Sequence, residues 1–179
     1  MAERGAAHLW AMRGLYLGLA TALVFVHLLP LDTVPRGWAG PDILLALTFA
    51  WSLRRPDFVP PVLIAAVFVL CDLLYQRTPG LWAGLVLLGS QMLRARAPDL
   101  RDLPFSLEWL SVASTLLVMT VVYRTILAVL MVDQAPLGLS LAQMVLTLVS
   151  YPLVVLVSHT ALGVRKIAPG EFDSMRSGR

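Results

Sequence analysis

The chain has 179 residues, of which 58% are hydrophobic and only 14% are charged. A soluble domain carries about 25% charged residues, so this composition excludes an ordinary soluble domain and indicates an integral membrane protein. The net charge is +3. Because the basic residues flank apolar stretches, we interpret them as contacts to anionic lipid and expect no nucleic-acid partner.

Six apolar segments, separated by Pro, Gly or charged residues, are predicted to form membrane-spanning helices in an all-α fold. In chain order they cover residues 12–29, 41–53, 57–75, 81–93, 106–132 and 139–164. The first segment follows basic residues, as in a secretory signal, but it ends without a small-x-small cleavage site. We therefore expect a retained helix within one domain, residues 1–164, followed by a short tail, residues 165–179.

Two of these segments are short for a membrane span. Thirteen residues at a rise of 1.5 Å reach about 20 Å, whereas the hydrocarbon core is about 30 Å thick. Segment 41–53 therefore either recruits flanking residues or lies inside the protein and is partly re-entrant. In segment 81–93, Gly84, Gly89 and Ser90 favour the close approach of another helix. In segment 139–164, Pro152 cannot bond to the Leu148 carbonyl, so a kink is expected.

The positions of the basic residues predict the orientation. With six spans, two Lys or Arg residues fall on one side, Arg36 and Arg77, and Arg124 falls within a span. Short cytoplasmic loops collect Lys and Arg, so the richer side is predicted to be cytoplasmic, together with both chain termini. The residues on that side are Arg4, Arg13, Arg54, Arg55, Arg94, Arg96, Arg101, Arg165, Lys166, Arg176 and Arg179.

Polar side chains inside a membrane are costly and are candidates for function. Arg124, Asp72 and His27 all fall in the half of the membrane away from the cytoplasm, and we predict an Asp72–Arg124 ion pair with His27 nearby. The alternative is that Arg124 extends to the headgroups while Asp72 meets water in a loop. His159 is interpreted as an interfacial side chain.

Catalysis finds little support in the sequence. Asp72 is the one acid that we place clearly inside a span, and no Gly-x-Ser-x-Gly, His-Glu-x-x-His or Walker A motif occurs. The lone cysteine, Cys71, lies in an apolar run, where it is expected to act as a small buried hydrophobe. We therefore expect no enzyme, no metal and no cofactor.

The stretch from Trp51 to Leu81 carries a resemblance to a known family. It contains Trp-x-x-Arg-Arg-Pro, then an apolar run, then Cys-Asp-Leu-Leu and a Thr-Pro-Gly-Leu turn. This pattern, the chain length and the spacing of the spans resemble MreD, the rod-shape-determining membrane protein of bacteria. The matching positions are Trp51, Arg54, Arg55, Pro56, Asp72 and Gly80.

The resemblance implies a non-enzymatic scaffold of the cell-elongation machinery in the bacterial inner membrane. Its expected partner is an MreC-like single-span protein, which links it indirectly to MreB filaments and to the RodA–class B penicillin-binding-protein synthase. The resemblance also implies a fold similar to the six-helix substrate-binding subunit of energy-coupling-factor transporters.

That likeness leaves a second hypothesis, a small-molecule-binding subunit of a membrane transporter. Such a subunit needs a roomy cavity with several converging polar groups, in the half of the membrane away from the cytoplasm. We expect few such groups, which favours the scaffold. The candidates are His27, Asp72, Gln76, Arg124 and Gln143.

Overall fold

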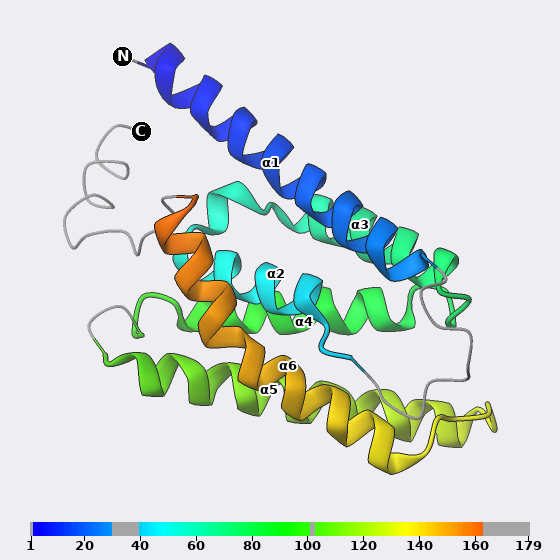
Figure 1. Cartoon of the computed structure of the whole chain (residues 1–179). Coiled ribbons are helices and arrows are strands. Elements are labelled where there is room, and N and C mark those ends of the chain that lie inside the picture. The colour runs from blue at the N-terminus through cyan, green and yellow to red at the C-terminus, as the bar shows by residue number, and fades with distance from the viewer. Residues whose placement is uncertain (1, 30–39, 101–102, 163–179) are drawn as a thin grey trace.

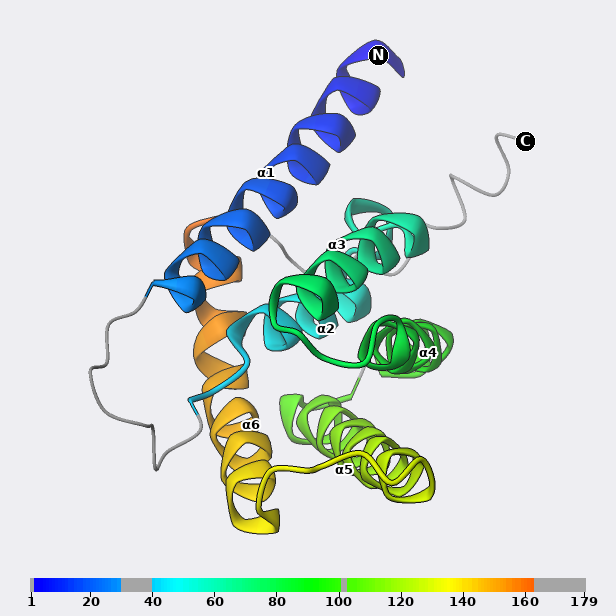
Figure 2. The ribbon, with the colours of Figure 1, turned by 90° about the vertical axis from the view of Figure 1, so that its right-hand side faces the viewer.

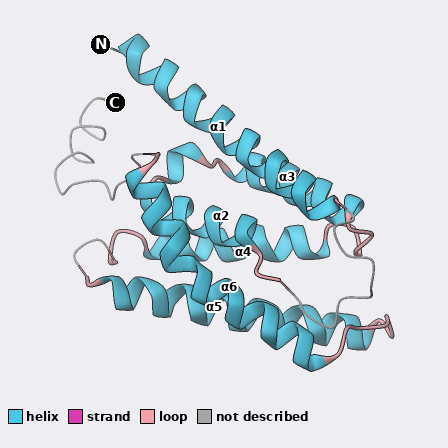
Figure 3. Ribbon diagram, in the orientation of Figure 1, coloured by secondary structure: helices cyan, strands magenta, loops and turns pink. Residues whose placement is uncertain are grey.

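The computed structural model describes residues 2–29, 40–100 and 103–162, without the side chains of residues 2–5. These residues form six α-helices and one 3₁₀-helix, so the all-α prediction is confirmed for them (Figure 1, Figure 3). The elements are α1 (Ala2–Leu28), α2 (Ile43–Arg54), η1 (Pro56–Phe58), α3 (Pro61–Leu74), α4 (Leu81–Arg96), α5 (Phe105–Val129) and α6 (Leu137–Thr160).

Three of the helices are long and apolar enough to cross a membrane. They are the stretch Ala6–Leu28 of α1, α5 and α6, whereas α2 and α3 are shorter apolar helices. By length and composition the chain is therefore a membrane protein, and the six-span topology stays a prediction. The tail, with Arg165, Lys166, Arg176 and Arg179, lies outside the described residues, as do Arg36 and Arg101.

The prediction for the start of the first helix was wrong. The helix begins at Ala2, about ten residues before the expected start at Met12. The early residues include Ala, Glu and Arg, which are strong helix formers even without an apolar face. The apolar run begins only near Met12, so it does not reveal the polar turns that precede it.

Four helices surround a common axis, and we call them the four-helix ring. Contacts run from α2 to α4, α4 to α5, α5 to α6 and α6 back to α2. Figure 2 looks along this ring and shows α1 and α3 lying on its α2 side. The helix α3 packs on α4, and α1 contacts η1, α2 and α3.

The helix α2 is the most buried element of the ring, with residues 44–54 all buried. Asp42 caps its N-terminus, because the carboxylate accepts a hydrogen bond from the Leu45 amide at 2.9 Å. The burial agrees with the alternative in which this segment lies inside the protein, and its re-entrant course through the membrane stays a prediction. Cys71 is also buried, at 2% exposed, as expected.

Close packing between α4 and α5 occurs at one of the two predicted glycines. A Cβ atom added at Gly89 would lie 2.6 Å from the Met119 sulfur and 3.1 Å from Thr115 Cγ2. At Gly84 the same atom would meet nothing within 4 Å. The prediction of close approach is therefore confirmed for Gly89 and for buried Ser90, and it is wrong for Gly84.

The helix α6 continues through Pro152. The Leu148 carbonyl, which Pro152 cannot serve, instead accepts a hydrogen bond from Trp109 Nε1 of α5 at 3.0 Å. A side chain of the neighbouring helix therefore replaces the missing helical bond, as polar groups in lipid require.

Candidate functional site

The two ends of the four-helix ring differ in how their polar side chains are used. We call the end that holds Arg54, Glu108 and Tyr151 the closed end. The opposite end, where α2, α4 and α6 begin and α5 finishes, is called the open end. In Figure 1 the open end lies on the right, at the loop between α5 and α6.

A buried ionic network joins three helices at the closed end. Arg54 of α2 donates from Nε to Glu108 Oε1 at 3.2 Å and from Nη2 to Oε2 at 3.3 Å. Tyr151 of α6 donates to the same Glu108 Oε1 at 3.0 Å. The side chains of Arg54 and Glu108 are 9% and 1% exposed. This network connects α2 across the ring to α5 and also to α6.

The burial of the acid Glu108 is not predicted by the sequence. The charge pattern predicts Arg54 as an orientation anchor at the cytoplasmic membrane boundary, yet the structure buries it against this carboxylate. The missed signal was an acid in the first turn of α5, at the same end of the bundle as the last turn of α2.

Three other residues of the family-like motif, Trp51, Arg55 and Pro56, lie near the closed end. Trp51 is fully buried and donates from Nε1 to Ser158 Oγ of α6 at 3.1 Å. Arg55 lies over the Phe58 ring, and Pro56 begins η1. The carbonyl of Asp57 in η1 accepts two bonds from the Arg13 guanidinium, each at 3.2 Å.

The predicted Asp72–Arg124 pair is wrong. Asp72 is fully buried, and its Oδ2 accepts hydrogen bonds from the Gly80 amide at 3.0 Å and the Ala83 amide at 3.1 Å. The N-terminal amides of a helix lack helical partners and attract negative charge. Gly80 has a φ of +80°, in the left-handed region, which turns the chain so that α4 begins beside Asp72.

Arg124 instead holds the loop between α5 and α6. Its Nη1 donates to the Ala135 carbonyl at 3.0 Å and to Ser140 Oγ at 2.8 Å. Gln134 Nε2 returns a bond to the Arg124 carbonyl at 3.0 Å. His27 packs against Tyr75 at the end of α3, with the two ring centres 4.7 Å apart. The three predicted cluster residues therefore contact three different parts of the fold.

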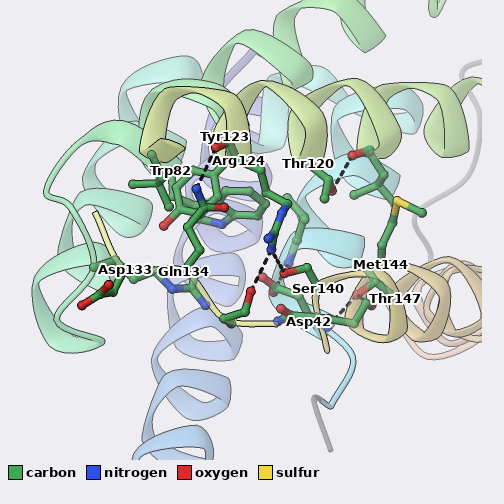
Figure 4. A pocket seen from close by; sticks show the side chains of 16 residues that line it. Asp42, Trp82, Thr120, Tyr123, Arg124, Asp133, Gln134, Ser140, Met144 and Thr147 are labelled. Carbon is green, nitrogen blue, oxygen red and sulfur yellow. Dashed lines mark hydrogen bonds between the residues drawn. The ribbon is translucent and has the colours of Figure 1, made fainter. Parts of the chain in front are cut away.

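A cavity of about 260 Å³ lies at the open end of the ring (Figure 4). Of the five polar groups expected there, Arg124 and Gln143 line it, while His27, Asp72 and Gln76 do not. The lining residues are Asp42, Leu45, Arg77, Trp82, Leu116, Thr120, Tyr123, Arg124, Leu127, Asp133, Gln134, Ala135, Ser140, Gln143, Met144 and Thr147. The cavity is thus richer in polar groups than the sequence suggested.

Several of these residues were missed because they sit at helix ends, where the sequence analysis assigned them to loops or caps. Asp42 begins α2, and its amide donates to Thr147 Oγ1 of α6 at 2.9 Å. Arg77 lies in the turn before α4. Helices α2, α4 and α6 all begin at the open end. The common position of these three N-termini is the signal from which the lining residues could have been recognised as neighbours.

Comparison with known protein families, curated proteins and solved structures finds no match for this chain. Within residues 2–29, 40–100 and 103–162, no group of three or more His, Cys, Asp or Glu side chains could hold a metal ion. The fold and the site define a helical membrane protein with a four-helix ring, braced by a buried ion pair at one end and hollowed by a polar cavity at the other.

Proposed function

We propose that this protein is a non-enzymatic scaffold of the bacterial cell-elongation machinery, similar to MreD. It would lie in the inner membrane with six membrane helices and both termini in the cytoplasm. The closed end, which carries Arg13, Arg54, Arg55 and Arg94, would face the cytoplasm, in keeping with the preference of Lys and Arg for that side.

The observation that carries the proposal is the use of the family-like motif inside the fold. Trp51 and Arg54 bond to side chains of α5 and α6, and Asp72 bonds to the start of α4. Gly80 supplies the left-handed turn that brings this start to Asp72. A motif in which Trp51, Arg54 and Asp72 hold helices together stabilises a rigid helical body, which is what a scaffold needs.

The helix α1 offers a face for a partner helix. Gly14 and Gly18, four residues apart, are exposed, and a Cβ atom added at either would meet nothing within 4 Å. Small residues at this spacing let two membrane helices approach closely. We propose that the single span of an MreC-like protein packs along this face, so that cytoplasmic MreB filaments and the RodA–class B penicillin-binding-protein synthase are coupled through it.

Co-purification in mild detergent tests the proposal. The full chain is co-expressed with the host's MreC-like protein as wild type, Gly18→Leu and Gly84→Leu. Gly84→Leu is the matched control, because it also replaces a helical glycine with open space around it. We expect the wild type and the control to retain the partner and Gly18→Leu to lose it, with all three chains equally folded by circular dichroism.

Two other results would count against parts of the proposal. If the folded wild type retains no MreC-like protein, the scaffold function falls. If all three chains retain it equally, the scaffold stands but the α1 face is the wrong docking surface.

The cavity favours a second candidate function, the small-molecule-binding subunit of a membrane transporter. Its polar lining, which includes Arg77, Arg124 and Gln143, exceeds what the scaffold requires. Co-purification with the energising subunits of such a transporter, in place of the MreC-like protein, would favour this candidate. Failure to associate with them would remove it.

A further inference from the structure

The open-end cavity combines charged groups with an apolar wall. Leu45, Leu116, Leu127 and Met144 form part of that wall, and Arg77 and Arg124 bring two guanidinium groups to it. Its volume of about 260 Å³ corresponds to about nine water molecules at roughly 30 Å³ each. A molecule of this size is small, on the scale of a short carboxylic acid or a phosphate-bearing headgroup.

Both arginines keep donors available for a ligand. Arg124 uses Nη1 for Ala135 and Ser140, and its Nε and Nη2 make no hydrogen bond within the described part of the chain. The guanidinium of Arg77 lies over the rings of Tyr75 at 5.3 Å and Trp82 at 5.8 Å. Those ring faces fix its position, and its N–H groups have no hydrogen-bond partner among the residues that the structure describes.

The two acids of the cavity equal the two arginines in number, and Arg77 acts electrostatically on Asp42. Asp42 serves as the cap of α2 through the Leu45 amide. Asp133 is exposed, and Figure 4 shows its carboxylate at the edge of the group, away from Arg124 and Ser140. Neither acid forms an ion pair with Arg77 or Arg124 over the described ranges. The formal charges of the wall therefore balance, but the N–H groups of Arg77 and Arg124 that no acid binds remain available to a ligand.

We propose that this cavity binds a small molecule through a carboxylate or phosphate group held by Arg77 and Arg124. The planar guanidinium matches the geometry of both anions and binds either in a bidentate manner. Gln143 and Thr120 supply further polar contacts from α6 and α5, and the leucines accept the ligand's carbon atoms. The anion can come from a free metabolite or from the headgroup of a lipid.

The proposal deepens the second candidate function, because a binding subunit needs an occupied cavity. It is nevertheless separable from that function. A saturable anion response in a chain that associates with no transporter subunit keeps the binding site and removes the transporter.

The test measures ligand-dependent thermal unfolding of the purified full chain. In one arm the chain in detergent is titrated with sodium phosphate and with sodium succinate at constant ionic strength, so that general screening is held fixed. In the other arm the chain is placed in nanodiscs of phosphatidylcholine, with and without phosphatidylglycerol. Each arm compares the wild type with Arg77→Gln, Arg124→Gln and Arg96→Gln. Arg96 is the control, because it is exposed on α4 near the opposite end of the ring.

We expect a saturable stabilisation of the wild type that Arg96→Gln retains. Arg77→Gln should weaken it about tenfold or more, since it removes charge-assisted bonds. Arg124→Gln should also weaken it, although this variant additionally releases the loop. A response to phosphate or succinate identifies a free anion as the ligand, and a response confined to phosphatidylglycerol discs identifies a lipid headgroup. If the wild type and Arg77→Gln respond alike in every arm, or no probe stabilises the wild type, the proposal is overturned.

Discussion

The closed and open ends of the four-helix ring carry similar side chains and use them in opposite ways. At the closed end, the Arg54 guanidinium binds the Glu108 carboxylate, and the Tyr151 hydroxyl donates another hydrogen bond to the same acid. At the open end, Arg77 and Arg124 meet no acid in an ion pair among the described residues, and a cavity remains between the helices.

The difference shows that the role of a buried charge depends on whether a neighbouring helix places an opposite charge at the same height along the bundle. Where a neighbouring helix presents that partner, the charge becomes a structural brace between helices. Where the nearby acids form no ion pair with the cation, as with Asp42, which caps α2, and exposed Asp133, the cation keeps N–H donors for a ligand. A membrane interior makes this contrast sharp, because water is scarce as an alternative partner.

Breaking the closed-end brace should have the largest effect. Glu108→Leu leaves Arg54 buried without its carboxylate, which should lower the free energy of unfolding by about 3–5 kcal/mol. Replacing both partners, Arg54→Met with Glu108→Leu, should cost less than Glu108→Leu alone, because no uncompensated charge stays buried. Unfolding of the purified chains in a denaturing detergent, followed by tryptophan fluorescence, measures these costs.

The open end supplies the matched comparison for that experiment. Arg77→Gln removes contacts with the rings of Tyr75 and Trp82, which should cost less than about 1 kcal/mol. If Arg77→Gln and Glu108→Leu lower the free energy of unfolding equally, the arginine at the open end is as important for stability as the brace at the closed end, and the contrast between the two ends is wrong. A double variant as costly as the sum of its single variants would show that Arg54 and Glu108 act independently.

Removing the contact between Asp72 and the start of α4 should lower the free energy of unfolding by a smaller amount. Asp72→Ala leaves the amides of Gly80 and Ala83 without an acceptor, which should cost about 1–3 kcal/mol. Asp72→Asn keeps an acceptor oxygen and should cost less. A double-mutant cycle with Arg124→Ala should give a coupling energy below about 0.5 kcal/mol, as expected for residues without a shared contact. A coupling above this level would restore the ion pair that the sequence predicts.

The sequence could predict the features that depend only on residues close together along the chain. Apolar runs and the Pro and Gly residues between them predict six helices, and Pro152 predicts a free Leu148 carbonyl. The partner of Asp72 could not be predicted, because it depends on a left-handed turn at Gly80 that places the start of α4 beside α3. Spacing along the chain does not reveal that approach.

The candidate site was less predictable than the fold. An acid in the first turn of a helix is usually exposed, so Glu108 gave no sign of burial until α2 and Tyr151 were seen to cover it. The cavity likewise arises where the ends of several helices meet. Arg124 and Gln143 could be named as candidates in advance, but their grouping with Arg77 required the arrangement of the ring.

The smallest expected effect concerns the bond that Trp109 donates to the Leu148 carbonyl. Trp109→Phe should lower the free energy of unfolding by about 0.5–1.5 kcal/mol, because this carbonyl loses its donor. In a Pro152→Ala background the same substitution should cost less, since the amide of residue 152 can then bond to the Leu148 carbonyl within α6. Detergent unfolding of the four chains of this cycle measures the difference. An equal cost of Trp109→Phe in both backgrounds would show that the indole contributes through packing alone, and that the bond across α5 and α6 does not compensate for the proline.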